Sequence, residues 1–209
     1  IEDQQLSASN TLVDQDGLGD ISYQWLRNQV SIIGASTSTY ILGDDDVGSV
    51  ISVIASYTDT HGTNESITSH STPTITNIND IPTGSVTISG NAIEGQQLTA
   101  SNSLADQDGL GMVNYQWQRD GNSRNGATTS TYTLSDDDVG TQISIIASYT
   151  DGHGTNESVA SDSTPAITNL NDAPTGTVTI SGDAIEDQQL SASNTLVDQD
   201  GLGDISYQW

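Results

Sequence analysis

The chain has 209 residues, with 28 aspartates and glutamates against only three lysines and arginines, and its formal net charge is −25 at pH 7. Binding to nucleic-acid phosphates or to anionic lipid needs clustered cations, so this composition excludes both as principal activities. The absence of cysteine excludes a disulfide framework and leaves packing and bound ions to stabilise the fold. No apolar run approaches the length of a membrane span, so we expect no direct membrane contact.

The sequence repeats itself at a period of 92 residues without insertion or deletion. Ile1 to Trp25 recurs letter for letter at Ile185 to Trp209, and a close copy lies at Ile93 to Trp117. This period is too long for a solenoid turn or a propeller blade, but it suits a small β domain with its own core. The phase of the copies predicts an excerpt of a longer array that starts and stops within a repeat.

Pro-Thr-Gly at Pro82 and at Pro174 interrupts any continuing strand and marks the expected repeat boundaries. Residues 1–81 are then a β-sandwich repeat that lacks its first strand, and residues 82–173 are a complete repeat. Residues 174–209 hold the first three strands of a further repeat.

Within the complete repeat, short apolar runs alternate with turn residues. The predicted strands are Val86–Ile88, Leu98–Ala100, Val113–Trp117, Thr131–Leu134, Ile143–Ala147 and Ser158–Ile167, the last bent near Pro165. Val113, Tyr115 and Trp117 share one face, and we expect Trp25 and Trp117 to fill the cores. No segment has a sustained helical period. Short strands at this spacing predict an all-β fold of antiparallel sandwiches.

Acidic and amide side chains recur at corresponding positions in each period, and they are the residues with evident chemistry. Hard divalent cations take six to eight oxygens from carboxylates, amides and backbone carbonyls, so Ca²⁺ is the expected ion. The clusters are Glu2 and Glu94; Asp14–Gly17 and Asp106–Gly109; Asp44–Asp46 and Asp136–Asp138; Asn77–Asp80 and Asn169–Asp172; and Asp59 and Asp151 with Asn64-Glu65 and Asn156-Glu157.

Two motifs of the complete repeat resemble the immunoglobulin-like family. Tyr-Gln-Trp at 115–117 is similar to the strand of that family with the buried tryptophan, and Thr-Leu-Ser-Asp-Asp-Asp-Val-Gly at 133–140 is similar to its E–F corner. The resemblance implies tandem immunoglobulin-like sandwiches with Greek-key topology. The chain departs from the antibody pattern because it has no cysteine pair and carries Ile143 where a corner tyrosine is expected.

In that family, the A–B and E–F loops and the end of the last strand lie at one pole, and the B–C and F–G loops lie at the other. The resemblance therefore implies that acidic residues of one repeat face those of the next. The expected metal ligands are Glu2, Asp44, Asp46, Asn79, Asp80, Asp106, Asp108 and Asp151 at one junction, and Glu94, Asp136, Asp138, Asn171, Asp172, Asp198 and Asp200 at the next. So many carboxylates would repel one another strongly unless cations lay among them.

This arrangement is similar to the junction of cadherins. Asn79-Asp80 before Pro82 looks like the cadherin linker, Asp106-x-Asp108 looks like its Asp-x-Asp loop, and Glu2 looks like its early glutamate. The resemblance implies Ca²⁺ held between domains, which stiffens a flexible array.

Over essentially all of its length, the chain resembles the extender repeats of giant secreted bacterial adhesins of the repeats-in-toxin type. The order Val-Thr-Ile-Ser-Gly, Tyr-Gln-Trp, Asp-Asp-Asp-Val-Gly, Ala-Ser-Tyr-Thr-Asp and Asn-Asp-x-Pro carries the likeness. It implies a non-enzymatic, extracellular spacer at the bacterial cell surface that projects a distal adhesive domain of unknown ligand. Its partners would be calcium ions and the neighbouring repeats.

Two other functions stay open. A carbohydrate-binding or protein-binding adhesion module would be favoured by an exposed Tyr23 or Tyr115 beside an ion and a groove, although near-identical copies suit a spacer better. An enzyme would have to use His61 with Asp59 and Ser66, but neighbours on one loop rarely reach triad geometry.

The acidic clusters also have purely structural interpretations. An Asp-x-Asp-Gly segment is often a turn with solvated carboxylates, and a triple aspartate can simply cap a corner. Arg27 and Arg119 follow a predicted strand, and we expect each to pair with a local carboxylate.

Overall fold

The computed structural model describes all 209 residues and shows an all-β protein, with 37% of the residues in strands, antiparallel sheets and no α-helix. No helix is long and apolar enough to cross a membrane. The chain divides into two compact units. Unit 1 comprises Ile1–Pro82 with the loops Asp106–Leu110 and Thr150–Thr155, and unit 2 comprises Thr83–Ala105, Gly111–Tyr149 and Asn156–Trp209.

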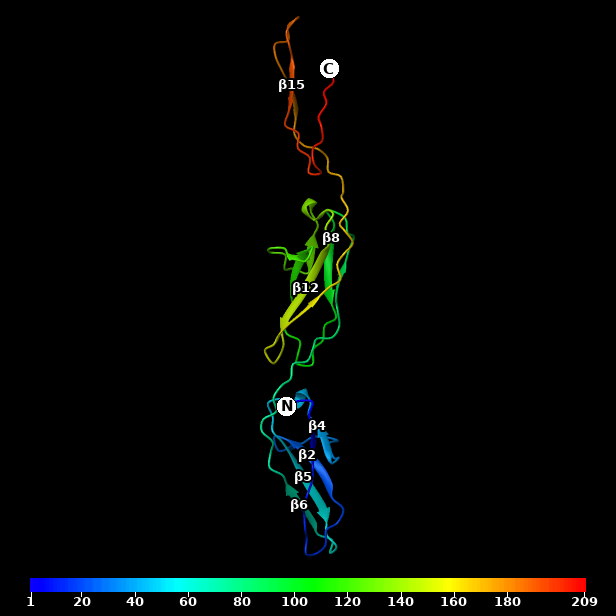
Figure 1. Cartoon of the computed structure of the whole chain (residues 1–209), viewed down its shortest axis with the longest axis vertical. Coiled ribbons are helices and arrows are strands. Elements are labelled where there is room, and N and C mark those ends of the chain that lie inside the picture. Colours follow the sequence, from blue (N-terminus) through cyan, green and yellow to red (C-terminus); the bar gives the residue numbers. More distant parts are fainter. The chain divides into compact units, whose positions relative to one another are not determined.

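Unit 1 contains two sheets and a short 3-10 turn. Its strands are β1 (Gln5–Ser7), β2 (Ser22–Arg27), β3 (Val30–Ser31), β4 (Thr39–Ile41), β5 (Ile51–Thr58) and β6 (Asn64–Thr68), and the turn η1 spans Asp44–Asp46. One sheet has the order β3-β2-β5-β6, and the other pairs β1 with β4 (Figure 1). Trp25, Leu42, Ile51 and Ile75 form the buried core.

The complete repeat builds most of unit 2. Its strands are β7 (Val86–Ser89), β8 (Gln97–Asn102), β9 (Asn114–Arg119), β10 (Asn122–Ser123), β11 (Thr131–Thr133), β12 (Ile143–Thr150) and β13 (Asn156–Ala160), with the turn η2 at Asp136–Asp138. They form a sheet of order β11-β8-β7 and a sheet of order β10-β9-β12-β13. Farther along the chain, β14 (Val178–Ser181) pairs with β15 (Ser191–Asn194).

Both sheets of the complete repeat bury side chains in one core, which is consistent with a β-sandwich. Leu98 comes from the three-stranded sheet, and Trp117 and Ile143 come from the four-stranded sheet; all three are fully buried. Trp117 stacks on Tyr132 with ring centroids 5.5 Å apart, and its Nε1 donates to Thr129 O at 2.9 Å. The predicted core role of Trp117 is confirmed, as is that of Trp25, which is 4% exposed.

The predicted last strand is wrong in its extent. It ends as β13 at Ala160 rather than continuing to Ile167. Beyond that point, Ser161 Oγ and Thr164 Oγ1 serve as acceptors in place of backbone carbonyls, since they accept hydrogen bonds from the N–H groups of Ile145 and Ile143 at 3.1 Å. The backbone N–H groups of Ser161 and Thr164 still donate to the carbonyls of Ile145 and Ile143, both at 2.9 Å. Pro165 has no N–H to donate, so a regular ladder cannot pass through it.

Candidate metal centre

Three carboxylates of unit 1 converge to form what we call cluster 1. Glu2, Asp44 and Asp80 each offer one oxygen, and these oxygens lie within 4.8 Å of one another. Because Ca²⁺ binds oxygen at about 2.3 to 2.6 Å, two ligands of one ion lie at most about 5.2 Å apart. All three oxygens can therefore reach a single ion.

The backbone fixes Glu2 and Asp44 in this position. Glu2 N donates to Thr76 O at 3.0 Å, and Glu2 Oε2 accepts from Ile78 N at 3.2 Å, so the carboxyl group is held against the segment that leads to Asp80. The next residue, Asp3, ties this turn to the end of β4 through a hydrogen bond to Leu42 O at 3.1 Å. Asp44 begins the 3-10 turn that follows directly.

Asp108 connects cluster 1 to the loop Asp106–Leu110. Its Oδ2 accepts a hydrogen bond from Asp80 N at 2.7 Å, and its side chain is buried. Its backbone oxygen accepts from Gly152 N at 3.0 Å, which brings the loop Thr150–Thr155 against it. A Cβ atom at Gly152 would lie 2.5 Å from that oxygen, so the close approach requires glycine.

Asp151 lies on the second of these loops and is 7% exposed. Its Oδ1 accepts from the backbone N–H groups of His153 and Thr155, both at 2.8 Å. Burial acts to raise the pKa of Asp151, but the hydrogen bonds from Thr155 and His153 outweigh it, and the pKa is lowered. This carboxylate is therefore ionised at neutral pH.

Several buried oxygens of unit 1 have no hydrogen-bond partner. They are Glu2 Oε1, Asn77 Oδ1, Asp108 Oδ1 and Asp151 Oδ2. Buried polar atoms are almost always paired, because leaving one unsatisfied costs about 1 to 3 kcal/mol. Three of these four oxygens belong to carboxylates, so a bound cation could satisfy them, and His153 Nε2 lies 4.0 Å from one of them, Asp108 Oδ1.

The crowding of acidic groups in cluster 1 also raises the pKa values of Glu2 and Asp80. Asp44 is the main cause that raises the pKa of Glu2 to about 7, because a hydrogen bond between the two carboxyl groups forms only when one of them is protonated, and burial adds to the shift. Burial raises the pKa of Asp80 as well, and the charges of Asp44, Asp108 and Asp3 add to the effect. Without a cation, cluster 1 therefore tends to retain protons.

Unit 2 contains a corresponding cluster 2, formed by Glu94, Asp136 and Asp172, whose ligand oxygens also lie within 4.8 Å of one another. Leu170 N donates to Glu94 Oε2 at 3.2 Å, and Asp172 N donates to Asp200 Oδ2 at 2.7 Å, as at the equivalent positions of unit 1. The hydrogen bond with Asp136 is the main cause that raises the pKa of Glu94. Asp200 is exposed, whereas the equivalent Asp108 is buried.

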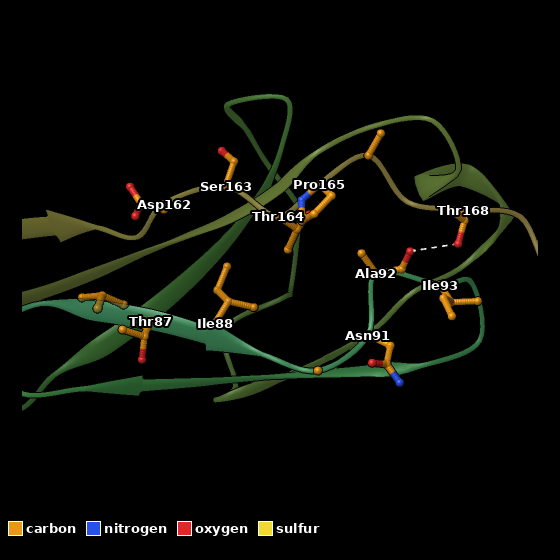
Figure 2. A pocket seen from close by; sticks show the side chains of 13 residues that line it. Thr87, Ile88, Asn91, Ala92, Ile93, Asp162, Ser163, Thr164, Pro165 and Thr168 are labelled. Carbon is orange, nitrogen blue, oxygen red and sulfur yellow. Dashed lines mark hydrogen bonds between the residues drawn. The ribbon is translucent and has the colours of Figure 1, made fainter.

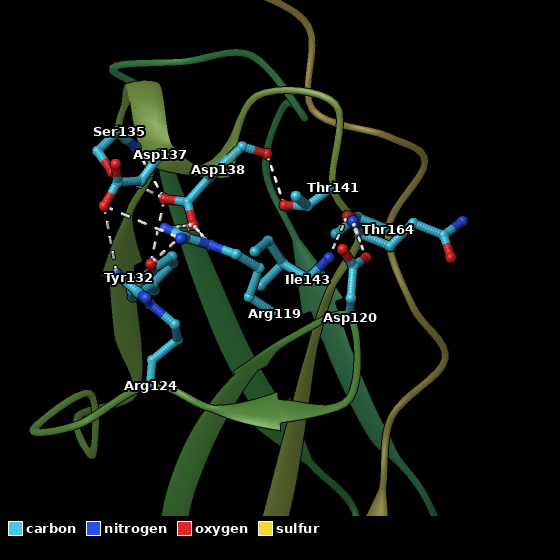
Figure 3. Close-up of polar contacts among 11 residues, drawn as sticks. Arg119, Asp120, Arg124, Tyr132, Ser135, Asp137, Asp138, Thr141, Ile143 and Thr164 are labelled. Carbon is cyan, nitrogen blue, oxygen red and sulfur yellow. Dashed lines mark hydrogen bonds and ion pairs between the residues drawn. The ribbon is translucent and has the colours of Figure 1, made fainter.

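The structure does not bring Asp46 or Asp138 into either cluster, and both leave the proposed ligand set. Asp138 is fully buried beside Arg119, whose Nη2 and Nε lie 2.5 and 2.6 Å from Asp138 Oδ1 (Figure 3). Tyr132 OH and Ser135 N donate to the same carboxylate at 3.0 and 2.9 Å.

Asp46 is held in the same way in unit 1. Arg27 Nε donates to it at 2.7 Å, and Tyr40 OH donates at 2.9 Å. These carboxylates already have a counter-cation and donors, so the predicted pairing of Arg27 and Arg119 with local carboxylates is confirmed.

The remaining predicted residues shape the surrounding loops. Asp106 Oδ1 accepts from Asp108 N at 2.9 Å, and Asp198 Oδ1 accepts from Asp200 N at 3.0 Å, so both aspartates close turns. Asn79 Nδ2 donates to Asp80 O at 3.2 Å, and Asn171 Nδ2 donates to Asp172 O at 2.9 Å.

Asn77 was not among the predicted ligands, yet the structure buries its partnerless Oδ1. The signal was present in the alternation of Asn77 with Asn79, which places both amides on the same side of an extended segment.

The residues of the conceivable hydrolytic trio have backbone partners. Asp59 Oδ1 accepts from the N–H groups of His61 and Thr63 at 2.9 and 2.7 Å. The His61 ring lies 4.0 Å from Asp16 rather than forming a hydrogen bond with Asp59, and Ser66 pairs with Ser56 across β5 and β6.

Both clusters offer only oxygen ligands. Carboxylate and amide oxygens without cysteine or histidine suit hard cations such as Ca²⁺ and Mg²⁺ rather than Zn²⁺. Compared with known proteins, the chain matches no family model and no curated protein at a significant level.

Proposed function

We propose that the chain is a non-enzymatic, calcium-binding structural spacer built of tandem immunoglobulin-like, cadherin-like sandwiches. In this proposal it belongs to a secreted adhesin of the bacterial surface and resembles the extender repeats of repeats-in-toxin adhesins. The observation that carries the proposal is the convergence of three carboxylates in cluster 1, next to Asp108, whose Oδ2 accepts a hydrogen bond from Asp80 N and whose buried Oδ1 has no hydrogen-bond partner.

Calcium would act on the loops that unit 1 gathers. Its ligands would be Glu2, Asp44 and Asp80, joined by Asp108 and Asp151 from the two loops that belong to the next repeat of the sequence. An ion shared by these segments neutralises their repulsion and links successive repeats, so that the array stiffens when calcium is present. At a hundred times its dissociation constant, one bound ion adds about 2.7 kcal/mol to the free energy of unfolding.

The test is calorimetric titration of the 209-residue chain with CaCl₂ and with MgCl₂, together with small-angle scattering before and after chelation. We expect calcium binding with a dissociation constant of about 0.1 to 1 mM, as in other extracellular calcium modules. We also expect a rise in melting temperature and a narrower distribution of interatomic distances.

A matched pair of variants identifies the site. Asp44→Asn with Asp136→Asn removes one carboxylate from each cluster and should abolish most of the heat of binding. Asp45→Asn with Asp137→Asn removes the same charge from exposed neighbours and should leave binding intact. Equal loss of binding in both pairs, or an unchanged melting temperature in the unaltered chain, would contradict the proposal.

A further inference from the structure

The complete repeat contains the only asparagine of the chain that is followed directly by glycine, Asn125-Gly126. The pair lies at the centre of the turn 124–127, which Ala127 N closes by donating to Arg124 O at 3.1 Å. Gly126 has a φ of +76°, a conformation that glycine adopts without strain. The pair therefore forms the tip of an ordered surface turn.

The groups that could react in this pair are unprotected. Asn125 and Gly126 are both exposed, and neither the side-chain amide of Asn125 nor the backbone N–H of Gly126 takes part in a hydrogen bond. A Cβ atom at Gly126 would meet nothing within 4 Å, so the turn stands in open space. Because glycine has no side chain, nothing on Gly126 itself shields its nitrogen.

Aspartate-glycine pairs elsewhere in the chain have their glycine nitrogen occupied. Gly109 N donates to Asp106 O at 3.2 Å, and Gly152 N donates to Asp108 O at 3.0 Å. In those loops the nitrogen holds the backbone of a neighbouring segment. The nitrogen of Gly126 has no such task.

We propose that Asn125 is a site of spontaneous deamidation. Gly126 N attacks Cγ of Asn125, so that an N–Cγ bond forms, the Cγ–Nδ2 bond breaks, and Nδ2 leaves as ammonia with the proton of Gly126 N. Water then opens the cyclic imide at either carbonyl carbon, adding its hydroxyl to the carbon and its proton to the ring nitrogen. The products are aspartate and isoaspartate at position 125, and water is the only co-reactant.

Asn91 provides a comparison within the same repeat. It is exposed too, and Figure 2 shows its side chain pointing away from Thr164 across the ribbon. Its neighbour is Ala92, whose Cβ hinders attack by the Ala92 nitrogen, so Asn91 should stay intact while Asn125 converts. In unit 1, the pair equivalent to Asn125-Gly126 is Ile33-Gly34, which has no amide to lose.

The position of the pair gives the reaction a structural consequence. On one side of it, Arg124 N donates to Trp117 O at 2.9 Å, and on the other side Ala127 O accepts from Trp117 N at 3.0 Å. Isoaspartate lengthens the backbone between these two anchors by one carbon atom, so both hydrogen bonds to the core tryptophan cannot keep their geometry. Aspartate leaves the backbone length unchanged. The isoaspartyl product should therefore be the less stable one.

The test is to age the folded 209-residue chain in mildly alkaline buffer with chelator, which separates the outcome from calcium binding. Intact-mass spectrometry should show a gain of about 1 Da, the replacement of an amide by an acid. Peptide mapping with electron-transfer fragmentation should place the gain at Asn125, with isoaspartate present, and find Asn91 unchanged. Urea denaturation of the aged chain should reveal a second, less stable population.

Asn125→Gln should abolish the mass gain, because glutamine would have to close a larger ring, and the exposed, partnerless side chain makes loss of the fold no concern. Asn91→Gln is the matched control and should age like the unaltered chain. Asn125→Asp carries the charge of the product without the longer backbone and should unfold like the fresh chain. No mass gain in the folded chain, a gain only in urea, equal conversion of Asn91, or a gain that persists in Asn125→Gln would overturn the inference.

Discussion

Glu2 is the residue at which a proton would compete with the proposed cation for cluster 1. Glu2 is 1% exposed, and its carboxyl group can share a proton with that of Asp44, so its pKa rises from 4.5 to about 7. In the ion-free protein, the protonated form of Glu2 therefore stabilises the fold. This contribution is fully present below pH 4.5 and is lost as the pH rises through 7.

Calcium reverses this dependence because it needs the ionised carboxylate. We predict that calcium affinity rises with pH up to about 7 and that binding at about pH 6 releases a proton, whereas binding at about pH 8 does not. Titration calorimetry in two buffers of different ionisation enthalpy measures the released proton. Glu2→Gln should remove the part of the pH dependence that comes from cluster 1, and an affinity that does not vary with pH would contradict the role of Glu2.

Asp138 has a structural role instead, because its carboxylate binds the residues around the corner at η2 and stabilises it. Removing its carboxylate takes away the buried partner of Arg119, whose side chain is 17% exposed, and leaves the guanidinium only the exposed Asp137 at 3.9 Å. The loss costs about 3 kcal/mol, the low end of the range for buried pairs. We predict that Asp138→Ala lowers the free energy of unfolding by about this amount, measured by urea denaturation. The control Asp137→Ala, at a side chain 75% exposed, should change it by less than about 0.5 kcal/mol. An equal loss in the two variants would show that the buried pair has no special weight.

At the scale of the elements, the alternation of apolar residues was sufficient to predict most strands. Val86, Leu98, Trp117 and Ile143 each lie in a predicted strand and in the buried core, because period-two burial is a local property that the sequence displays directly. The end of β13 was not predictable in this way. There the hydroxyls of Ser161 and Thr164 accept hydrogen bonds in place of backbone carbonyls, and whether a hydroxyl does so depends on what lies opposite it.

The candidate site shows the same division between local and distant information. The sequence identified Glu2, Asp44, Asp80 and their equivalents as carboxylates of interest from composition and repetition. It could not separate Asp44 from Asp46, since neighbours on one turn point in different directions and only the fold shows that Arg27 takes the second.

The loop Thr150–Thr155 is the element that brings Asp151 to Asp108, and Gly152 permits its approach. We predict that Gly152→Ala separates the two loops, because the added Cβ would lie 2.5 Å from Asp108 O. Calcium affinity at cluster 1 should fall while cluster 2 is unchanged, as measured by calorimetry. Gly203→Ala is the control, since nothing lies within 4 Å of a Cβ at that position. Equal affinity in both variants would argue against a role of this loop in binding.

At the scale of the whole chain, the near-identity of the repeats provides two clusters of the same three carboxylates, each of which could hold an ion, in different surroundings. Cluster 1 adds a buried Asp108, which is 4% exposed, and Asp151 on the loop packed against it. In cluster 2, the equivalent Asp200 is exposed. Comparing ion binding at the two clusters therefore tests how much the burial of this aspartate contributes to affinity.

We predict two classes of calcium site in one chain, with cluster 1 at least about tenfold tighter because it has more carboxylate ligands and less competing water. Asp108→Asn should remove the tight class and leave the weak one, since it deletes a buried ligand oxygen. Asp200→Asn makes the same chemical change at the exposed position and should affect only the weak class. Because a buried carboxylate oxygen without a hydrogen-bond partner gains more from an ion than a solvated one, the first substitution should also reduce the calcium-dependent rise in melting temperature far more than the second. A single class of sites that responds equally to both substitutions would mean that burial of Asp108 has no part in binding.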